Sequence, residues 1–550
     1  MLWSVTLACV AVFFVYQCWR RHEHFQQFKK LGIPGPPPSF LFGNMVELYL
    51  KSPLHAHREW HRQYGPVLGY YFGYDPVLLV ADIKDLKNIL LRDFTDFTDR
   101  PQLMKGRTGA ALTILTGQRW KNVRSTLTPS FTTSKLKQLS PEVERVVDGF
   151  MDNVHKEFAS RGRSVDIYEL YQALTLETIC HTALGVDYDI QSDVANSKIL
   201  QKVKVVFTLD FNLLSIFLMA FPTMRRLTAR FIGRLRLMAK NKGEDPIDTL
   251  KKECANIVKR RRNDASLHQV DLLQLMIDAQ AVKNGPGTDI NSLIAGDEAE
   301  RNQKAQQNKK KVTDEKIPDE QCPMTAKLRA LTDEEVIDNA LVVLLAGYET
   351  TSSSLAFITR LLVRFPEVQE RLRQALVEAT ENGTGFDFER LQRCEYLDAV
   401  IQESLRMYPP VYSGTTRIAA KEKQYGDLTI PENIAVFTST RELHNNPDIF
   451  PNPHEYQPDR FLPENRTADM AFAWQPFGAG PRNCIGMKFA QMEIKIALAK
   501  LLMCYRLTGG EKDPVGDAHV DTTILPALQR IKDPLLVTLT KLDERLSVAA

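Results

Sequence analysis

Phe477-Gly-Ala-Gly-Pro-Arg-Asn-Cys-Ile-Gly486 is a glycine-rich loop that runs directly into a helical pattern over residues 487–502. A cysteine at a helix N-terminus feels the positive end of the helix dipole, which lowers the pKa of its thiol. Backbone N–H groups freed by the loop can point at the sulfur. Gly480 and Gly486 permit a close approach or a positive φ. The loop therefore predicts Cys484 as a thiolate ligand of iron, with Arg482 offering a cation to a nearby acid group.

Two other readings of this loop are weaker. A lone cysteine is most often a buried structural thiol. Gly478-Ala-Gly480 could begin a dinucleotide-binding fingerprint, but the third glycine of that pattern would fall on Asn483. The chain has eight cysteines and no Cys-x-x-Cys pair, so neither a disulfide framework nor a zinc site is expected.

The loop resembles the haem-binding signature of the cytochrome P450 superfamily, in which a cysteine thiolate ligates haem iron. Gly347-Tyr-Glu-Thr-Thr351 and Leu405-Arg-Met-Tyr-Pro-Pro410 are most similar to the microsomal, class II branch. That branch contains drug- and steroid-oxidising enzymes, with thromboxane synthase as a relative. The resemblance implies a mainly α (α+β) fold, with a large helical domain and a small β-rich domain. It also implies haem b, iron protoporphyrin IX, as the cofactor.

The same resemblance assigns residues to the haem site. It implies that Cys484 ligates the iron, and that the haem propionates contact Arg482, Trp120, Arg124 and Arg417. Trp120 and Arg124 stand at a helix-like spacing of four; without the resemblance, a core tryptophan and a surface arginine explain them equally well. Further haem neighbours implied by the resemblance are Phe477, Gly480, Gly486 and Ala346.

Glu403 and Arg406 stand three residues apart in the helical run 397–407. This spacing places both charges on one helix face, close enough to pair. Taken alone, the pair is best explained as a solvated surface ion pair. In the resembled family, however, such a pair joins a later arginine, here Arg460, in a network that fixes the cysteine loop. Asp459 stands where glutamate is usual.

The strongest predicted helix covers residues 331–365 and is ended by Pro366. Thr332 and Glu335 form a capping box at its start. Its apolar course is interrupted by Gly347, Glu349 and Thr350; Gly347 alone costs about 1 kcal/mol against alanine. Because so much unfavourable chemistry lies in the best helix, we expect a functional site there. The resemblance implies that Glu349 and Thr350 relay protons to dioxygen.

The implied reaction is monooxygenation of a lipophilic substrate (a xenobiotic, a steroid or a fatty acid). We see neither a dinucleotide fingerprint nor a P-loop, so NADPH-cytochrome P450 reductase is the expected electron donor, with cytochrome b5 as a further partner. Two alternatives stay open: a haem-thiolate isomerase or dehydratase of the thromboxane-synthase type, and a non-catalytic haem sensor. The expected substrate-facing residues are Val342, Leu345, Val411, Tyr412 and Ser413. A basic face for the reductase could include Arg119, Lys121 and Lys488.

Residues 1–19 are almost wholly apolar and are followed by Arg20 and Arg21. We expect a single transmembrane anchor with the body on the cytosolic face of the endoplasmic reticulum; a cleaved signal peptide fits less well. Residues 20–38 form a basic and proline-rich spacer, and residues 39–550 the haem-thiolate domain. A disordered insertion is expected at 284–327. The near balance of 70 basic and 67 acidic residues gives no reason to expect nucleic acid.

Three coarser expectations concern the body of the chain. Residues 65–82 read as short strands, and residues 85–280 as mostly helical, punctuated by Pro129, Pro141 and Pro222. The apolar run Phe211 to Phe221 is either a core helix or a segment that dips into the membrane; it is too short to span one.

Overall fold

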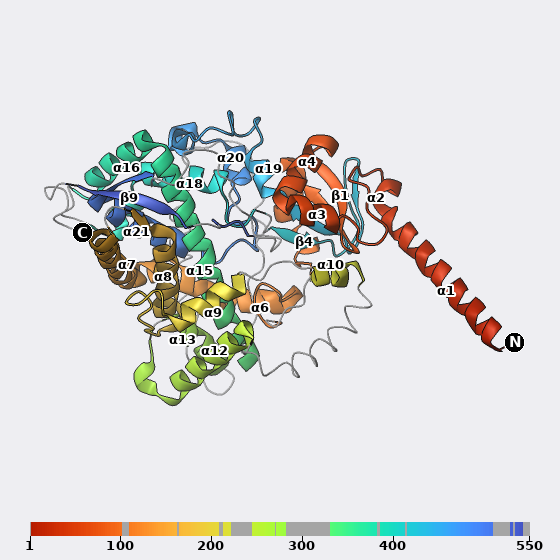
Figure 1. Cartoon of the computed structure of the whole chain (residues 1–550), viewed down its shortest axis with the longest axis horizontal. Helices are drawn as coiled ribbons and strands as arrows, with labels where there is room; N and C mark the ends of the chain where they lie inside the picture. Colours follow the sequence, from red (N-terminus) through yellow and green to blue (C-terminus); the bar gives the residue numbers. More distant parts are fainter. Residues whose placement is uncertain are drawn as a thin grey trace.

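The computed structural model describes most of the chain (Figure 1). The described residues are 2–101, 109–161, 164–207, 213–221, 245–269, 271–281, 331–381, 386–412, 415–509, 528–531 and 534–542. The predicted insertion at 284–327, Pro222 and Ser413 lie outside these ranges.

Helices form most of the described structure, as predicted. In chain order they are α1 (Leu2–Phe25), α2 (Gln27–Lys30), α3 (Met45–Lys51), α4 (Pro53–Tyr64), α5 (Ile83–Lys87), α6 (Gly117–Leu127), α7 (Thr133–Arg161), α8 (Ile167–Ile179), α9 (Lys198–Phe207), α10 (Leu213–Ala220), α12 (Pro246–Asn263), α13 (Leu272–Ala281), α15 (Asp333–Arg364), α16 (Pro366–Ala379), α17 (Phe388–Gln392), α18 (Glu395–Met407), α19 (Thr440–His444), α20 (Ala468–Ala473) and α21 (Met487–Cys504).

The strands form three small sheets. A four-stranded sheet has the order β1-β2-β7-β4, a three-stranded sheet the order β3-β9-β8, and β5 and β6 form a hairpin. Val67 pairs with Val80 in the antiparallel β1–β2 pair, so the strands predicted at 65–82 are confirmed. The strands are β1 (Val67–Phe72), β2 (Asp75–Val80), β3 (Ser164–Asp166), β4 (Thr416–Ile418), β5 (Lys423–Tyr425), β6 (Leu428–Ile430), β7 (Ala435–Thr438), β8 (Tyr505–Gly509) and β9 (Leu536–Lys541).

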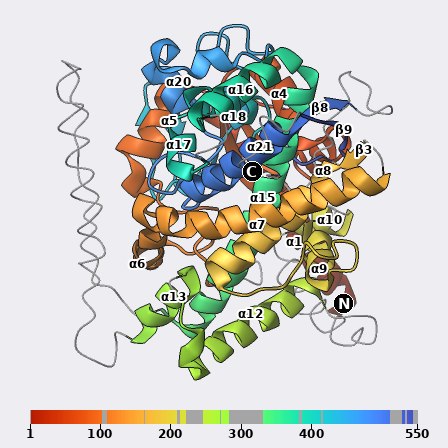
Figure 2. The ribbon, with the colours of Figure 1, turned by 90° about the vertical axis from the view of Figure 1, so that its left-hand side faces the viewer.

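The four-stranded sheet and the helical mass occupy different parts of the molecule. In Figure 1 the sheet lies near the anchor helix α1, and most of the long helices lie on the far side. Figure 2 shows α21 and α7 in front of α15, and α21 contacts both helices. This arrangement confirms the predicted helical domain with a small β-rich part.

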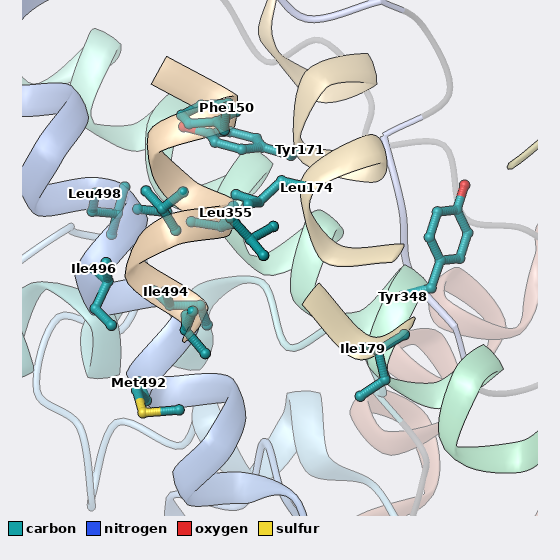
Figure 3. Packing of buried hydrophobic residues seen from close by; sticks show 14 of the residues in the cluster. Phe150, Tyr171, Leu174, Ile179, Tyr348, Leu355, Met492, Ile494, Ile496 and Leu498 are labelled. Atoms are coloured by element: carbon teal, nitrogen blue, oxygen red, sulfur yellow. The ribbon is translucent and has the colours of Figure 1, made fainter. Parts of the chain in front are cut away.

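Helix α15 passes through the main hydrophobic core. Leu344, Leu355 and Leu362 on this helix are no more than 2% exposed. Figure 3 shows Leu355 beside Tyr171 and Leu174 of α8, with the α21 side chains Ile494 and Leu498 nearby. The predicted capping box is present, because the Thr332 side chain accepts from the Glu335 N–H while the Glu335 carboxylate accepts from the Thr332 N–H. As predicted, the helix ends before Pro366, which begins α16.

Pro141 does not interrupt the chain as expected, because it lies inside α7. A proline removes the hydrogen bond to the carbonyl four residues earlier, here that of Lys137. The hydroxyl of Ser140 donates to the Lys137 carbonyl at 3.1 Å instead. A neighbouring side chain therefore supplies the bond that the proline cannot make, and the helix continues.

The N-terminal helix is longer than the predicted anchor. α1 continues through Arg20 and Arg21 to Phe25, and none of the best membrane-spanning window within it, in Trp3–Phe25, is buried. Asp333–Arg364 is the second helix of sufficient length and hydropathy among the described residues, but it is mostly buried. It is therefore a core helix of the body.

The proline-rich stretch is packed against the four-stranded sheet. The Gly69 N–H of β1 donates to the Pro34 carbonyl at 2.8 Å. The Asn44 amide donates to the carbonyls of Pro36 and Pro37 at 3.3 Å each. Prolines lack an N–H but keep their carbonyls, so Pro34, Pro36 and Pro37 accept hydrogen bonds from β1 and from Asn44, which precedes α3.

The apolar run that ends at Phe221 has a mixed environment. Ile216 and Met219 of α10 are 4% exposed and pack beside the four-stranded sheet, whereas Phe217 is 40% exposed. The described part of this run, residues 213–221, therefore has one face in the core, and its contact with a membrane stays a prediction.

Candidate functional site

The cysteine loop has the backbone that its glycines predict. Gly478 and Gly480 both have φ of +72°, a region that side chains rarely adopt. A Cβ atom on Gly480 would lie 2.2 Å from the carbonyl oxygen of Leu90. The Cys484 N–H donates to the Phe477 carbonyl at 2.8 Å and closes the loop. Gly480 is therefore required for the loop to lie against the segment that carries Leu90.

Gly486 has neither the positive φ nor the close approach that was expected at this glycine. Its φ is −87°, and a Cβ atom there would meet Phe131 at an ordinary contact distance of 3.8 Å. Its contribution is the backbone N–H, which donates to the Cys484 sulfur and favours the thiolate. One freed N–H therefore points at the sulfur, as predicted.

Cys484 lies just before α21 with an accessible side chain. Its thiol pKa is nevertheless raised by burial, which outweighs the Gly486 N–H and the charges of Arg124 and Arg100. The predicted lowering of the pKa is therefore wrong for the free thiol, since desolvation exceeds the effect of the helix end. An accessible sulfur that is also desolvated fits a side chain that opens onto an interior space. A bound metal ion would deprotonate such a thiol outright.

Arginine side chains from three parts of the chain hold the backbone of this loop. Arg124 of α6 donates to the Asn483 carbonyl and to its side-chain oxygen, both at 3.0 Å. Arg417 of β4 donates to the Ala479 carbonyl at 3.1 Å. Arg100 donates to the Arg482 carbonyl at 3.2 Å. The loop is thus fixed by cations that contact its carbonyl groups.

Arg482 points from the loop toward the segment before α6. It donates to the Leu115 carbonyl at 2.6 Å and lies 3.5 Å from Asp99. Its guanidinium carbon is 4.2 Å from the centre of the Trp120 ring, a cation–π geometry. The structure therefore brings Trp120 and Arg482 together, and the buried Trp120 serves here as a platform for the cation.

The positive charge at this site exceeds the negative charge. In the described part of the chain, Asp99 is the one carboxylate in ion-pair distance of these four arginines. Burial and the neighbouring arginines lower the pKa of Arg417 to about 9 and that of Arg482 to about 9. The Nε atoms of Arg100, Arg417 and Arg482 are buried without a hydrogen-bond partner among the described residues. Crowded cations with unused donors fit an anionic ligand, such as the two propionates of haem.

The predicted Glu403 network is present and buried. Arg406 donates to Glu403 through Nε at 2.7 Å and Nη2 at 2.8 Å. Arg460 donates to Glu403 Oε1 at 3.1 Å. The side chains of Glu403 and Arg406 have no exposed area. The alternative, a solvated surface pair, is therefore excluded.

His444 connects this network to the cysteine loop. Its Nδ1 lies 3.0 Å from the Arg406 carbonyl, and its Nε2 accepts from the Gln475 N–H at 2.9 Å. The two contacts fix the neutral tautomer with the proton on Nδ1. Burial lowers the pKa of His444 to about 3. Gln475 precedes Phe477 by two residues, so the imidazole joins the end of α18 to the start of the loop.

The middle of α15 has one accessible position in a buried stretch. Ala346 is exposed although Leu344 and Tyr348 are buried. Thr350 donates its hydroxyl to the Ala346 carbonyl at 2.7 Å. Open space therefore lies beside Ala346, as it does beside Cys484.

Glu349 faces a different neighbour. It is 1% exposed, and its Oε1 accepts from the hydroxyl of Tyr168 in α8 at 2.9 Å. Burial raises the pKa of its carboxyl group. No hydrogen bond joins the Glu349 carboxyl to the Thr350 hydroxyl. The two predicted relay residues are adjacent in the chain, but their side chains have separate partners.

The predicted substrate-facing residues differ in exposure. Val342 and Leu345 of α15 are half-buried, and Val411 forms a β-bridge with Leu528. Tyr412 is 2% exposed and lies close to Tyr70. Tyr412 is thus packed in the protein interior, whereas Val342 and Leu345 keep part of their surface accessible on the same helix as Ala346.

The three basic residues expected to meet a reductase also differ. Arg119 forms an ion pair with Glu335 of the α15 capping box. Lys488 is exposed and donates to the Thr133 hydroxyl at 3.0 Å, and Lys121 is half-buried. Arg119 is therefore paired within the protein at the start of α15. Lys121 and Lys488 remain the candidates for contact with a reductase.

Sequence reasoning missed three residues of this site. Arg100 is the fourth arginine at the cysteine loop, where it contacts the Arg482 carbonyl. His444 connects the Glu403 network to that loop, and Tyr168 donates a hydrogen bond to Glu349. No local motif marks any of them, because each acts through a partner more than 30 residues away.

Comparison with known proteins gives one consistent result. The family model described as Cytochrome P450 matches residues 33–296 and 290–527. Cytochrome P450 3A28 of Bos taurus is 30% identical over 507 residues, covering 91% of this chain and 89% of that protein. Cytochrome P450 3A6 of Oryctolagus cuniculus is 32% identical over 480 residues, covering 86% of this chain and 85% of that protein. Cytochrome P450 3A29 of Sus scrofa is 31% identical over 485 residues, with coverage of 86% and 85%.

Proposed function

The chain belongs to the cytochrome P450 family, in its microsomal drug-oxidising branch, and on that premise we propose which substrates, electron donor and residues serve its monooxygenase activity. Members of the family bind haem b and use dioxygen. The proposed substrate is a lipophilic xenobiotic, steroid or fatty acid, and the proposed electron source is NADPH through a separate reductase. The balanced reaction is RH + O₂ + NADPH + H⁺ → ROH + H₂O + NADP⁺.

The observation that carries this proposal is the accessible sulfur of Cys484 beside four crowded arginines. Cys484 would ligate the haem iron, and Arg100, Arg124, Arg417 and Arg482 would hold the propionates. Bound haem supplies the redox-active iron at which dioxygen is activated. The protein's part is to keep the sulfur in place and to neutralise the propionate charge. The Glu403 network and His444 fix the loop that carries that sulfur.

Proton delivery is proposed for the middle of α15. Thr350 holds its hydroxyl on the Ala346 carbonyl, at the edge of the open space. Glu349 is the carboxyl group next to Thr350 in the chain, and burial raises the pKa of that carboxyl, so it holds a proton more readily than a solvated glutamate. The two side chains are adjacent in the chain, so a rotation of either side chain or one water molecule can join them.

A lipophilic substrate is supported by the apolar residues beside this space. Val342, Leu345 and Ala346 offer no charged group, so binding there would depend on burial of apolar surface. Val411, Tyr412 and Ser413 complete the proposed substrate side. Tyr412 would contribute to the shape of the substrate-binding region, because its side chain is already packed in the protein interior.

The proposed location is the cytosolic face of the endoplasmic reticulum membrane. An exposed apolar helix followed by Arg20 and Arg21 supports a single anchor with the body on the cytosolic side. The body would be residues 39–550, with an insertion at 284–327; the two family-model segments meet at 290–296, inside that range. NADPH-cytochrome P450 reductase and cytochrome b5 are the proposed partners, with Lys121 and Lys488 on the docking face.

The first experiment replaces the proposed iron ligand. Cys484→Ser should abolish the thiolate-type spectrum of the reduced, carbon-monoxide-treated protein, while Cys504→Ser at the far end of α21 should keep it. A histidine-type spectrum in the wild-type protein would overturn the proposal. Turnover with NADPH, reductase and a panel of steroids, fatty acids and xenobiotics then identifies the substrate. Product formation without NADPH or oxygen would favour the isomerase alternative, and binding without product would favour a sensor.

A further inference from the structure

The two carboxylate oxygens of Glu349 have different surroundings. Oε1 accepts from the Tyr168 hydroxyl at 2.9 Å, whereas Oε2 is buried with no hydrogen-bond partner among the described residues. The whole side chain is 1% exposed. An unpartnered buried carboxylate oxygen is costly when ionised. Glu349 therefore keeps one oxygen fixed and one available for a proton.

Tyr168 holds its hydroxyl between two side chains of α15. Besides Glu349, the hydroxyl lies 3.3 Å from the Ser353 Oγ, which is one turn farther along the helix. The Tyr168 side chain is 7% exposed, and burial raises the pKa of its phenol well above the ordinary value. It stays protonated at all working pH values, so toward a carboxylate it can only donate.

Charged groups from two other elements also face Glu349. Arg530, in the described segment 528–531, and Lys204 of α9 each favour the ionised carboxyl, but their effect is through space. Burial is the largest influence on the pKa of Glu349 and raises it; the Tyr168 hydrogen bond is the largest influence that lowers it. Among the groups that favour the ionised form of Glu349, the Tyr168 hydroxyl therefore has the largest effect.

We propose that Tyr168 is the positioning residue of Glu349: its hydroxyl holds the carboxyl on the α8 side of α15 and keeps it able to ionise. This inference deepens the proposed proton relay and rests on it for its functional meaning. A group that passes protons must both bind and release them at the working pH. Without the Tyr168 hydroxyl, a larger share of the buried carboxyl would be protonated at a given pH, and the carboxyl would lose the contact that fixes its direction.

The direct test is the titration of Glu349, followed through the infrared carbonyl band of its protonated carboxyl group. The band is assigned as the one that disappears in Glu349→Gln. In Tyr168→Phe the midpoint should rise by roughly one pH unit or more, as expected for a lost hydrogen bond to a charged group. This readout is independent of turnover.

Tyr171→Phe is the matched control. Tyr171 lies on the same helix, is fully buried and bonds the Thr359 hydroxyl of the same α15 at 2.8 Å, but it does not contact Glu349. Its variant should leave the Glu349 midpoint unchanged. An unchanged or lowered midpoint in Tyr168→Phe overturns the proposal, and so does an equal shift in both tyrosine variants.

A second readout is the share of NADPH that yields product rather than hydrogen peroxide, O₂ + NADPH + H⁺ → H₂O₂ + NADP⁺. Tyr168→Phe should lower this share near pH 7 and recover it as the pH is raised, because alkaline pH restores the ionised Glu349. Tyr171→Phe should show neither effect. If the infrared shift occurs but no variant or wild-type protein forms product, the proposed function fails while the positioning role stands. If Glu349→Gln lowers the share of NADPH that yields product but Tyr168→Phe does not shift the infrared band, the positioning role fails while the proposed function stands.

Discussion

The guanidinium group of Arg124 makes two hydrogen bonds to Asn483, one to its carbonyl and one to its side-chain oxygen, both 3.0 Å long. Asn483 directly precedes Cys484, so α6 holds the sulfur-bearing loop by its last residue before the thiol. We expect Arg124→Gln to lower the free energy of unfolding by about 2 kcal/mol and to reduce haem retention. Urea unfolding and the haem absorbance per protein check this. Arg145→Gln, at an exposed ion pair, should change both by far less.

Removal of one partner from the Glu403 network should be much more damaging. Arg406→Leu leaves a buried carboxylate with fewer donors, and losses of about 3–5 kcal/mol are typical for a broken buried pair. Arg371→Leu is the control, because its pair with Asp459 is half exposed and worth about 0–1 kcal/mol. Chemical unfolding of both variants measures the difference, and equal losses would contradict the buried network.

Gly480→Ala separates steric conflict from backbone strain. Gly480 and Gly426 both have positive φ, but a Cβ atom meets the Leu90 carbonyl at the first and open space at the second. Gly426→Ala should therefore cost about 1 kcal/mol of strain. Gly480→Ala should cost more and also displace the cysteine loop. Thermal unfolding together with the carbon monoxide spectrum distinguishes the two; similar behaviour of the variants would remove the proposed steric requirement.

Glu493 of α21 should make stability depend on pH. It is 1% exposed, and burial raises the pKa of its carboxyl from 4.5 to about 8. Because the folded state favours the protonated form, its contribution is complete below pH 4.5 and is lost as the pH rises to 8. In this window the free energy of unfolding should fall by roughly 1.4 kcal/mol per pH unit. Glu493→Gln should abolish that slope, so the two stability curves should diverge with rising pH; parallel curves would contradict the raised pKa.

Arg21 should fix the anchor helix to the body. It donates to the carbonyls of Phe40 and Ala220, and its guanidinium lies over the rings of Tyr74 and Phe221. We expect Arg21→Ala to increase amide hydrogen exchange in the 39–43 loop and in α10. Arg20→Ala is the control, since the Arg20 guanidinium lies over the ring of Tyr16, within α1 itself. Equal amide hydrogen exchange in the two variants would show that the contact between α1 and the body does not depend on the Arg21 cation.

Local patterns in the sequence predicted the elements that depend on neighbouring residues. The capping box of Thr332 and Glu335, the stop at Pro366 and the strands of residues 65–82 follow from backbone chemistry within one or two turns. Pro141 shows the limit of such reasoning, because its effect depends on whether a nearby side chain supplies the missing bond. The direction of the Cys484 pKa was wrong for a related reason: desolvation depends on atoms that the local sequence does not contain.

The cysteine loop, the charged pair at Glu403 and Arg406, the polar interruption of the long helix and the apolar N-terminus could all be identified from the amino-acid sequence. Each of these is a property of residue type at short spacing, and the physical rules for such spacings are local. Three relationships became visible only in the folded chain: Arg100 contacts the cysteine loop, His444 links Arg406 to Gln475, and Tyr168 donates a hydrogen bond to Glu349. Those relationships depend on long-range packing, which brings distant parts of the chain to hydrogen-bonding distance and sets how much water each group keeps.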